Sequence, residues 1–238
     1  MTDTMANTIV ANTHGSTATA HDPADLTLDE IRQQLAPVIA SNAAFDGWGD
    51  EARDYAAEGA GIDRDVAKLA FEGGSPTMID AWFDHVDAEM AARLPAERLA
   101  SMKVRQRITA LIETRLDVLA PDRESLRRAI AILALPTNVA RAARLGWRSV
   151  DRMWRLAGDT ATDYNHYTKR AMLLATYAAT ITVFLDDDSD GHAETRAFLA
   201  RRIDNIMAIE KAKASATART RYRPSLSRFV GRLRYPVA

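Results

Sequence analysis

The stretch WGDEARDYAAEGAGIDRDVAKLAFEGGSPTMIDAWF, residues 48–83, decides the fold. It predicts a helix from Asp50 to about Glu58, a turn at the GAG triplet, and a short helix from Arg64 to Phe71. After a Gly-Gly break, Ser75 and Pro76 are expected to begin a longer helix, as N-cap and first helical residue. This order of elements is the layout of a helix-turn-helix.

The rest of the chain also predicts helices. Apolar residues recur at helical spacing almost throughout, and no segment alternates long enough to suggest a strand. Thr27 and Glu30 have the spacing of a capping box, which begins a helix to about Ala40. Further helices are expected at residues 75–93, 96–119, 123–135, 148–156, 162–185 and 193–213. The predicted fold class is all-α with about ten helices, and the front end resembles the N-terminal module of TetR-type repressors.

The charge distribution disfavours DNA binding by this module. Residues 22–90 contain 16 acidic and 4 basic residues, a net charge of −12. Residues 201–238 contain 10 basic and 2 acidic residues, a net charge of +8. Neutralising even ~6 phosphates requires a surface rich in Lys and Arg. A TetR-type lipid-responsive transcriptional regulator is therefore the alternative function, and no nucleic-acid partner is expected.

No catalytic constellation is visible. The chain has no cysteine, which excludes disulfides and thiolate sites, and it lacks the common nucleophile and phosphate-loop motifs. His85 in DHVDAE imitates a metal site, but a solvated helix face is the favoured reading. The DDDSDG segment at residues 186–191 begins like a calcium loop, yet its twelfth position is Ala197 instead of a glutamate. We therefore expect no enzyme activity, no cofactor and no metal.

The segment GDTATDYNHYTKRAMLLATYAATITVFLDDD, residues 158–188, combines a polar, aromatic start with 15 uncharged residues (171–185). This run is too short and too dilute for a transmembrane span of ~20 apolar residues. A helix that is apolar all round must be buried on all sides. Its residues are expected to line a core, a dimer seam or a lipid pocket, together with Met153 and Trp154 on the preceding helix. The candidate lipid-binding residues are Met153, Trp154, Met172, Leu173, Leu174, Tyr177, Ile181 and Phe184.

The C-terminal segment predicts a membrane-surface element. Leu226, Phe229, Val230 and Leu233 fall on one helical face. Three arginines, Arg228, Arg232 and Arg234, lie off that face. A short basic amphipathic helix of this kind binds a membrane surface, or docks on its own domain as the alternative.

Five motifs in a fixed order resemble the Coq-nine family of ubiquinone biosynthesis proteins. They are ETRL (113–116), AILALPTNV (131–139), DRMWRLAGD (151–159), TDYNHYTKRAML (162–173) and FLARRIDNIM (198–207). The resemblance covers about residues 46–213. It implies a TetR-like homodimer that binds isoprenoid or quinone lipids and associates with the di-iron hydroxylase acting on demethoxyubiquinone. It also implies a non-catalytic accessory protein that presents quinone intermediates to this hydroxylase at the membrane.

The resemblance also implies positions and domains. The hydroxylase patch would fall on Asp163, Asn165, His166, Tyr167, Lys169 and Arg170. Animal members have a tryptophan at the position of His166, so we expect a weaker or pH-sensitive contact there. The expected organisation is a disordered tail (1–22), a helix-turn-helix-like module (23–92), a lipid-binding and dimerisation domain (93–214) and a basic tail with an amphipathic helix (215–238).

The N-terminus predicts a location. Residues 1–22 have no apolar run, no basic start and no arginine, so they match neither a secretory signal nor a mitochondrial presequence. With the Arg/Ala-rich composition, this predicts a cytoplasmic protein that is peripheral on the inner membrane of a bacterium.

Overall fold

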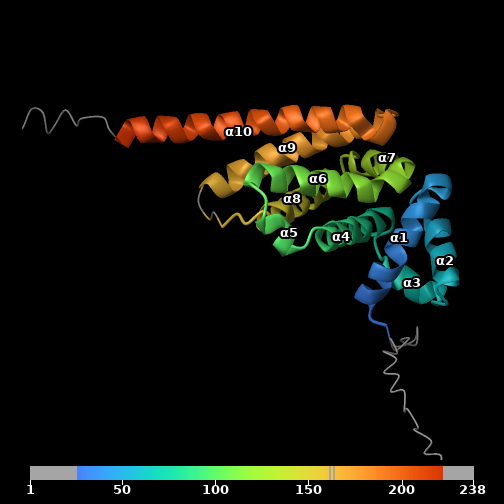
Figure 1. Cartoon of the computed structure of the whole chain (residues 1–238). Coiled ribbons are helices and arrows are strands. Elements are labelled where there is room, and N and C mark those ends of the chain that lie inside the picture. The colour runs from blue at the N-terminus through green and yellow to red at the C-terminus, as the bar shows by residue number, and fades with distance from the viewer. Residues whose placement is uncertain (1–25, 161, 163, 222–238) are drawn as a thin grey trace, which may run out of the picture.

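The computed structural model describes residues 26–160, 162 and 164–221, with side chains up to residue 209 (Figure 1). Over these residues the chain forms ten α-helices and two short 3₁₀ helices, and it contains no strand. The α-helices are α1 (Leu28–Asp46), α2 (Asp50–Gly59), α3 (Arg64–Ala70), α4 (Ser75–Arg93), α5 (Ala96–Ala100), α6 (Val104–Leu119), α7 (Arg123–Leu133), α8 (Val139–Leu156), α9 (Tyr164–Asp186) and α10 (Ala193–Arg221). The 3₁₀ helices are η2 (Ala120–Asp122) and η3 (Asp190–His192). The all-α prediction is therefore confirmed.

Helices α1–α3 form the head of the molecule, and the starts of α1 and α3 follow from local capping. The backbone N–H of Thr27 donates to the Glu30 carboxylate over 2.8 Å, and the Glu30 N–H donates to the Thr27 hydroxyl over 3.3 Å. This capping box begins α1, which continues past the expected end near Ala40. The Asp63 carboxylate accepts from the N–H of Asp65 over 2.8 Å and so begins α3. The predicted helix-turn-helix layout is thus present in α2 and α3.

Further boundaries differ from the prediction, and α10 continues past the expected end at Lys213 to Arg221. The expected helix over residues 96–119 is divided into α5 and α6, because a new N-cap forms at Lys103, whose N–H donates to the Gln106 side chain over 2.9 Å. Helix α8 begins at Val139 and not near Arg148. The N-cap of α4 is Gly74, with φ of 67°, and the Ser75 hydroxyl instead donates to the Trp48 carbonyl.

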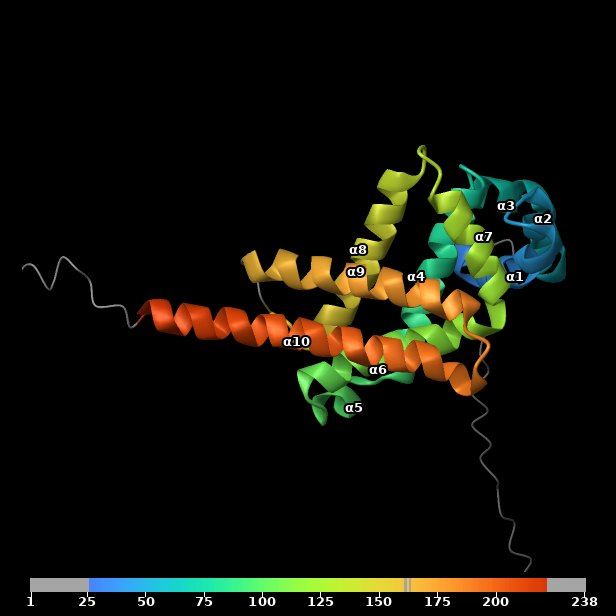
Figure 2. The same cartoon turned by 90° about the horizontal axis from the view of Figure 1, so that it is seen from above.

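Helices α4–α10 form the body. Helices α9 and α10 lie side by side in opposite directions and pack against α6, as both views show (Figures 1 and 2). Helix α8 packs against both α4 and α9. The body is therefore a bundle in which α9 lies between α8 and α10.

Head and body share one hydrophobic core. The rings of Trp48, in the head, and Trp82, on α4, are 5.2 Å apart between centroids. The Trp48 indole N–H donates to the Ser125 carbonyl on α7 over 2.9 Å, and the Ser125 hydroxyl donates to the Ala40 carbonyl on α1 over 2.5 Å. Both bonds are buried, so the head is fixed to α7 by polar as well as apolar contacts. The predicted domain division near residue 93 stays a prediction.

Helix α9 is not buried on all sides, contrary to the prediction. Ala171, Ala175, Ala178 and Thr182 are exposed and lie on one face of the helix. Small side chains make this face shallow, so α9 shows one open side in the single chain. Within the described part of the chain, none of the helices combines the length and the apolar character that crossing a bilayer requires.

Candidate lipid and partner site

The site is built around the crossing of α8 and α9. A Cβ atom added to Gly146 on α8 would lie 2.7 Å from Cδ1 of Leu174 on α9. A larger side chain at this position would push the Leu174 side chain aside, so Gly146 leaves room for Leu174 where the two helices cross. The crossing sets the spacing of the predicted lipid-binding residues, which come from these two helices.

The structure brings most of those residues into the core. Six of the eight are buried and the other two, Met172 and Leu174, are half-buried: the buried residues are Met153, Trp154, Leu173, Tyr177, Ile181 and Phe184. The cavities that we find between α1, α4 and α8 and between α6 and α10 have other linings. Lipid binding by the eight residues therefore stays a prediction.

Trp154 has an unusual environment for a buried indole. Its side chain is buried, yet its ring N–H has no hydrogen-bond partner among the described residues. The ammonium group of Lys169 lies 5.5 Å from the ring centroid, a cation–π distance. Buried polar groups are nearly always hydrogen-bonded, and an unpaired one costs about 1–3 kcal/mol. Trp154 is thus a donor without an acceptor inside an apolar wall.

A buried polar cluster joins four helices of the body. The Arg115 guanidinium on α6 pairs with Asp87 on α4 and donates over 2.6 Å to the hydroxyl of Tyr177 on α9. The Ser149 hydroxyl on α8 donates to the same Asp87 carboxylate over 2.9 Å. Burial raises the pKa of Tyr177 and outweighs the opposing effect of Arg115. Burial alone would lower the pKa of Arg115, but Tyr177 and Asp87 outweigh it, and the net shift is upward. One predicted lipid contact, Tyr177, therefore also holds α9 to α6.

A second ionic cluster holds the loop between α8 and α9. Arg170 Nε lies 2.6 Å from an oxygen of Asp151, and Arg170 Nη1 lies 3.0 Å from an oxygen of Asp159. Lys169 Nζ lies 2.8 Å from the other oxygen of Asp159. Burial alone would raise the pKa of Asp159, but the hydrogen bonds from Lys169 and Arg170 outweigh it and the pKa falls.

Arg170 therefore does not belong to an accessible partner surface, which corrects the prediction. It is 1% exposed, because both carboxylates that it binds lie beneath the start of α9. Lys169 is half-buried and ion-paired. The two basic residues of the predicted patch position the loop, and they do not project from it.

The exposed side chains at the start of α9 are mostly aromatic. Tyr164 is 78% exposed and Tyr167 is 61% exposed, one turn apart on α9. The Tyr167 ring stacks on Trp147 of α8 with centroids 6.2 Å apart, and it meets the His166 ring edge-on at 5.0 Å. We call Trp147, Tyr164, His166 and Tyr167 the aromatic surface. The sequence reading missed Trp147 and Tyr164, although an aromatic residue in the TDYN motif was a signal for the latter.

Several predicted site residues remain without a structural test. Asn165 is exposed beside the aromatic surface. Asp163 lies outside the described residues, as do all the predicted membrane-binding residues: Leu226, Arg228, Phe229, Val230, Arg232, Leu233 and Arg234. The membrane prediction consequently rests on their sequence pattern.

The DDDSDG loop uses its aspartates to connect α9 to α10. The buried Asp187 carboxylate accepts hydrogen bonds from the Ser189 N–H over 2.9 Å and from the Thr195 N–H over 2.8 Å. Asp186 and Asp188 pair with Arg127 and Arg123 of α7. Burial alone would raise the pKa of Asp187, but the hydrogen bonds from Ser189 and Thr195 outweigh it and hold the pKa far below its usual range. Within the described residues, no group of three or more His, Asp or Glu side chains could hold a metal ion.

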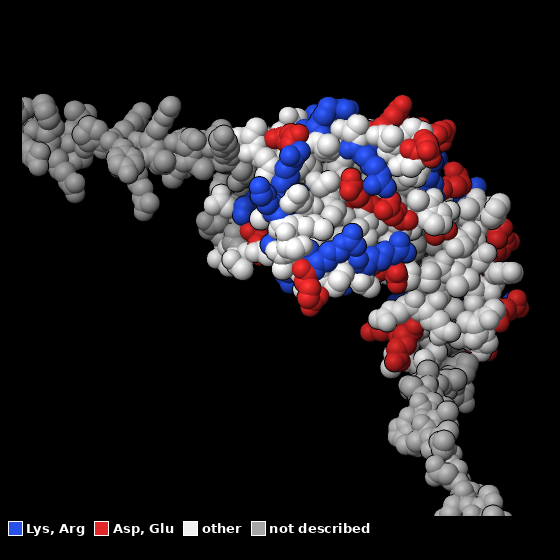
Figure 3. All heavy atoms as spheres, in the orientation of Figure 1, with Lys and Arg blue, Asp and Glu red and all other residues white. Residues whose placement is uncertain are grey.

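The head surface is acidic and partly apolar. In Figure 3, blue Lys and Arg spheres gather over the body, whereas the head at the lower right shows red groups and few blue ones. On α3 the guanidinium of Arg64 pairs with Glu58 of α2, and Val66 and Leu69 are exposed. Lys68 is also exposed on α3, but one lysine is far from the surface rich in Lys and Arg that phosphate contacts require.

Comparisons with known proteins bear on the family. The COQ9 family model matches residues 139–210. The "Ubiquinone biosynthesis protein COQ9, mitochondrial" of Rattus norvegicus is 34% identical over 185 residues, which are 75% of this chain and 59% of that protein. The protein of the same name from Homo sapiens is 34% identical, with 75% of this chain and 58% of that protein covered. The aligned part thus spans less than two thirds of the length of these relatives.

The solved structure of a TetR transcriptional regulator from Nitrosomonas europaea shares the fold. It matches with a TM-score of 0.59 and 24% identity, over 73% of this chain and 96% of that one. The TetR-like prediction is confirmed at the level of the fold. The predicted location, the cytoplasm and inner membrane of a bacterium, is contradicted, because the rat, human and bovine relatives are named as mitochondrial proteins.

Proposed function

The chain belongs to the COQ9 family, and on that premise we propose that it is a non-catalytic lipid-binding accessory protein of ubiquinone biosynthesis. It binds an isoprenoid quinone intermediate and presents it to the di-iron demethoxyubiquinone hydroxylase at a membrane surface. The names of the relatives support the pathway. The lipid and the hydroxylase are proposed because the resemblance of the chain's motifs to this family implies them, and the membrane contact is proposed from the pattern of the C-terminal segment.

The proposed lipid site is the apolar wall of α8 and α9. Met153 and Leu173 are fully buried there, and the half-buried Met172 and Leu174 are the members through which a chain could enter. Methionine side chains are flexible and adapt to irregular shapes. Each buried CH₂ contributes about 0.8 kcal/mol, so even two isoprene units give useful affinity.

The unpaired indole N–H of Trp154 is the observation that carries the proposal. A plain hydrocarbon site needs no donor, and a packed core pairs its donors internally. A quinone offers carbonyl oxygens at the end of an isoprenoid tail. We assign one of those oxygens as the acceptor for Trp154, so that the head group is fixed while the tail follows the apolar residues of α9.

The proposed docking surface for the hydroxylase is the aromatic surface. Tyrosine and tryptophan are enriched among the residues that dominate binding energy at protein interfaces. Tyr167 is supported from behind by Trp147, and the Arg170 cluster fixes the turn on which it lies. The surface lies at the start of α9, the same helix that carries the proposed lipid site, which brings cargo and partner together.

A membrane contact and a second copy complete the proposal. The C-terminal segment carries Phe229 and Leu233 on one face and arginines off it, a pattern that binds anionic lipid surfaces at roughly 1 kcal/mol per basic residue. The open face of α9, with Ala171, Ala175 and Ala178, is proposed as the homodimer seam, because small residues let two helices approach closely.

Lipids extracted from the purified full chain and identified by mass spectrometry test the proposal. We expect an isoprenoid quinone or its precursor. Trp154→Phe should weaken binding of ubiquinone about 2–10-fold, the loss of one hydrogen bond, and leave binding of squalene unchanged because squalene has no oxygen. The control is Trp147→Phe on the same helix. A chain without bound lipid and without affinity for ubiquinone would contradict the proposal.

A lipid-responsive transcriptional regulator is the alternative, since α2 and α3 keep the helix-turn-helix layout. The ion pair between Arg64 and Glu58 and the exposed Asp65 argue against phosphate contacts on α3. A gel shift at low salt against random genomic fragments decides between the two: retardation supports the regulator, and its absence supports the accessory protein.

A further inference from the structure

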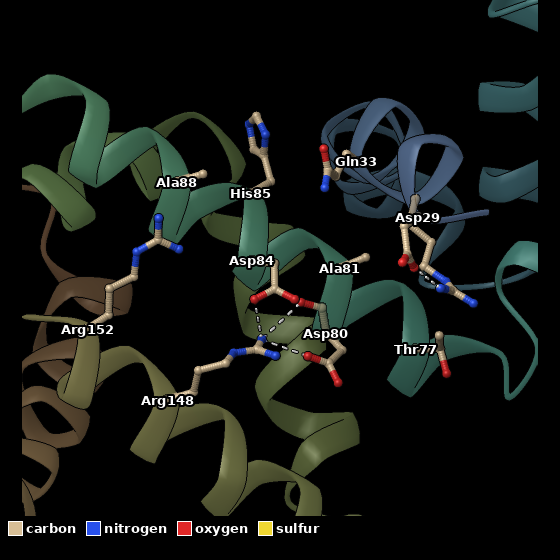
Figure 4. Close-up of a pocket in the computed structure, with 11 residues that line it drawn as sticks. Asp29, Gln33, Thr77, Asp80, Ala81, Asp84, His85, Ala88, Arg148 and Arg152 are labelled. Carbon is tan, nitrogen blue, oxygen red and sulfur yellow. Dashed lines mark hydrogen bonds and ion pairs between the residues drawn. The ribbon is translucent and has the colours of Figure 1, made fainter. Parts of the chain in front are cut away.

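A cavity of about 750 Å³ opens between α1, α4 and α8 (Figure 4). Its lining contains none of the eight residues predicted to bind lipid. The volume lies within the ~300–1,000 Å³ range of small-ligand sites. Because α1 belongs to the head and α8 to the body, a ligand here would contact both.

The charged groups of this cavity are unevenly paired. Arg148 Nη2 lies 2.7 Å from a carboxylate oxygen of Asp80 and 2.9 Å from one of Asp84, so a single guanidinium nitrogen serves both acids. Arg32 and Asp29 pair with each other at 2.5 Å on α1. The three acids of the lining therefore have cationic partners.

Two guanidinium groups retain unused donors. Arg152 lies one turn after Arg148 on α8, is half-buried, and forms no ion pair or hydrogen bond with the described residues. In Figure 4 its side chain extends from α8 toward α4, with no dashed line to a partner. The Nε atom of Arg148 is buried and also has no hydrogen-bond partner. The hydrogen-bond donors that remain unused in these two residues therefore belong to positively charged groups.

The remaining lining residues determine which ligand could fit, through their size and polarity. Ala81 and Ala88 leave room above α4, and Gln33 and His85 bring polar groups from opposite sides. Asp80 and Asp84 keep lone pairs that can accept hydrogen bonds from hydroxyl groups. A guanidinium fork matches the geometry of carboxylate and phosphate oxygens.

We propose that this cavity binds a small hydroxylated organic anion, through a carboxylate or phosphate group on the Arg152 guanidinium, with the ligand's hydroxyl groups donating to Asp80 or Asp84. The ligand bridges α1 and α8, which both pack against α4. This site is independent of the proposed quinone site.

The test is calorimetric titration of the full chain with inorganic phosphate, glycerol 3-phosphate and malate, at an ionic strength held constant with sodium chloride. We expect saturable binding of at least one organic anion. Arg152→Gln should weaken it at least tenfold, whereas Arg144→Gln, an exposed arginine on the same helix outside the cavity, should not change it.

A second variant shows whether any loss of binding in Arg152→Gln is due to misfolding. Ala88 is exposed in the cavity wall, so Ala88→Glu adds a repelling carboxylate without touching Arg152. It should weaken the same anion while the circular dichroism spectrum stays that of the wild type. Binding that is equal in Arg152→Gln, Arg144→Gln and the wild type would overturn the proposal. So would the absence of saturable binding to any of the three anions.

Discussion

Arg170 is buried at the start of α9, and its Nε lies 2.6 Å from the carboxylate of the half-buried Asp151. Arg155 binds the other oxygen of the same carboxylate at 2.8 Å, but from a side chain that is 73% exposed. One acid therefore has a buried and an exposed cationic partner, which allows the two contributions to be compared directly.

Arg170→Ala should lower the free energy of unfolding by about 3–5 kcal/mol, because it leaves the Asp151 and Asp159 carboxylates without their buried partner. Arg155→Ala should lower it by only about 0–1 kcal/mol, as for other exposed pairs. Urea unfolding followed by circular dichroism measures both. Equal losses in the two variants would show that burial does not decide the strength of this cluster.

Asp187→Asn should destabilise the chain by about 1–3 kcal/mol at neutral pH, because the carboxylate accepts four charge-assisted hydrogen bonds from Ser189 and Thr195. The pKa of Asp187 is lowered in the folded state, so its contribution is present above the unfolded pKa of about 3.9 and is lost as the pH falls through the folded value. Unfolding free energies measured between pH 7 and pH 2.5 should show a gap between wild type and variant that narrows with acid. A gap that is constant with pH would contradict the assignment.

Tyr167→Ala should weaken binding of the hydroxylase by roughly tenfold or more, if Tyr167 is a main anchor of the aromatic surface. Tyr55→Ala is a matched control, because Tyr55 on the head is 65% exposed and Tyr167 is 61% exposed. Interferometry with the immobilised hydroxylase measures both. An effect of the same size at Tyr55 would place the docking surface elsewhere.

Ala178→Arg should convert a homodimer into a monomer, because a long charged side chain on the open face of α9 keeps a second helix away. Ala88→Arg, an exposed alanine on α4, should leave the dimer intact. Size-exclusion chromatography with light scattering gives the mass of each variant. If the Ala178→Arg variant remained a dimer, the homodimer interface would have to lie on a face other than the open face of α9.

Much of the fold could be predicted from local signals. Thr27 with Glu30 predict the start of α1, and the glycines around residues 59–61 and 73–74 predict the ends of α2 and α3 and the start of α4 within a few residues, since capping acts through neighbouring atoms. The end of α1 lies at Asp46 and not near Ala40, as predicted. The break between α5 and α6 could not be predicted, because neither Gly nor Pro lies between Ser101 and Lys103.

The candidate site was harder to predict because its burial is decided by distant residues. From the sequence Arg170 is expected at the surface, but in the fold it is buried and ion-paired with Asp151 and Asp159. The cavity at Arg152 is lined by three helices that lie far apart in the sequence. No residue spacing along the chain could therefore predict it. Trp154 is among the predicted lipid-binding residues, but no spacing along the chain could predict that its buried indole N–H lacks an acceptor.

The bond from the Trp48 indole to the Ser125 carbonyl has a consequence for motion. A tilt of the head against the body would require a hinge between them that moves at low cost. Here any tilt of α1–α3 would have to expose the Trp48 ring and break a buried bond to α7. Amide protons of α1 should therefore exchange with solvent water as slowly as those of α7, and the chain should unfold in a single transition.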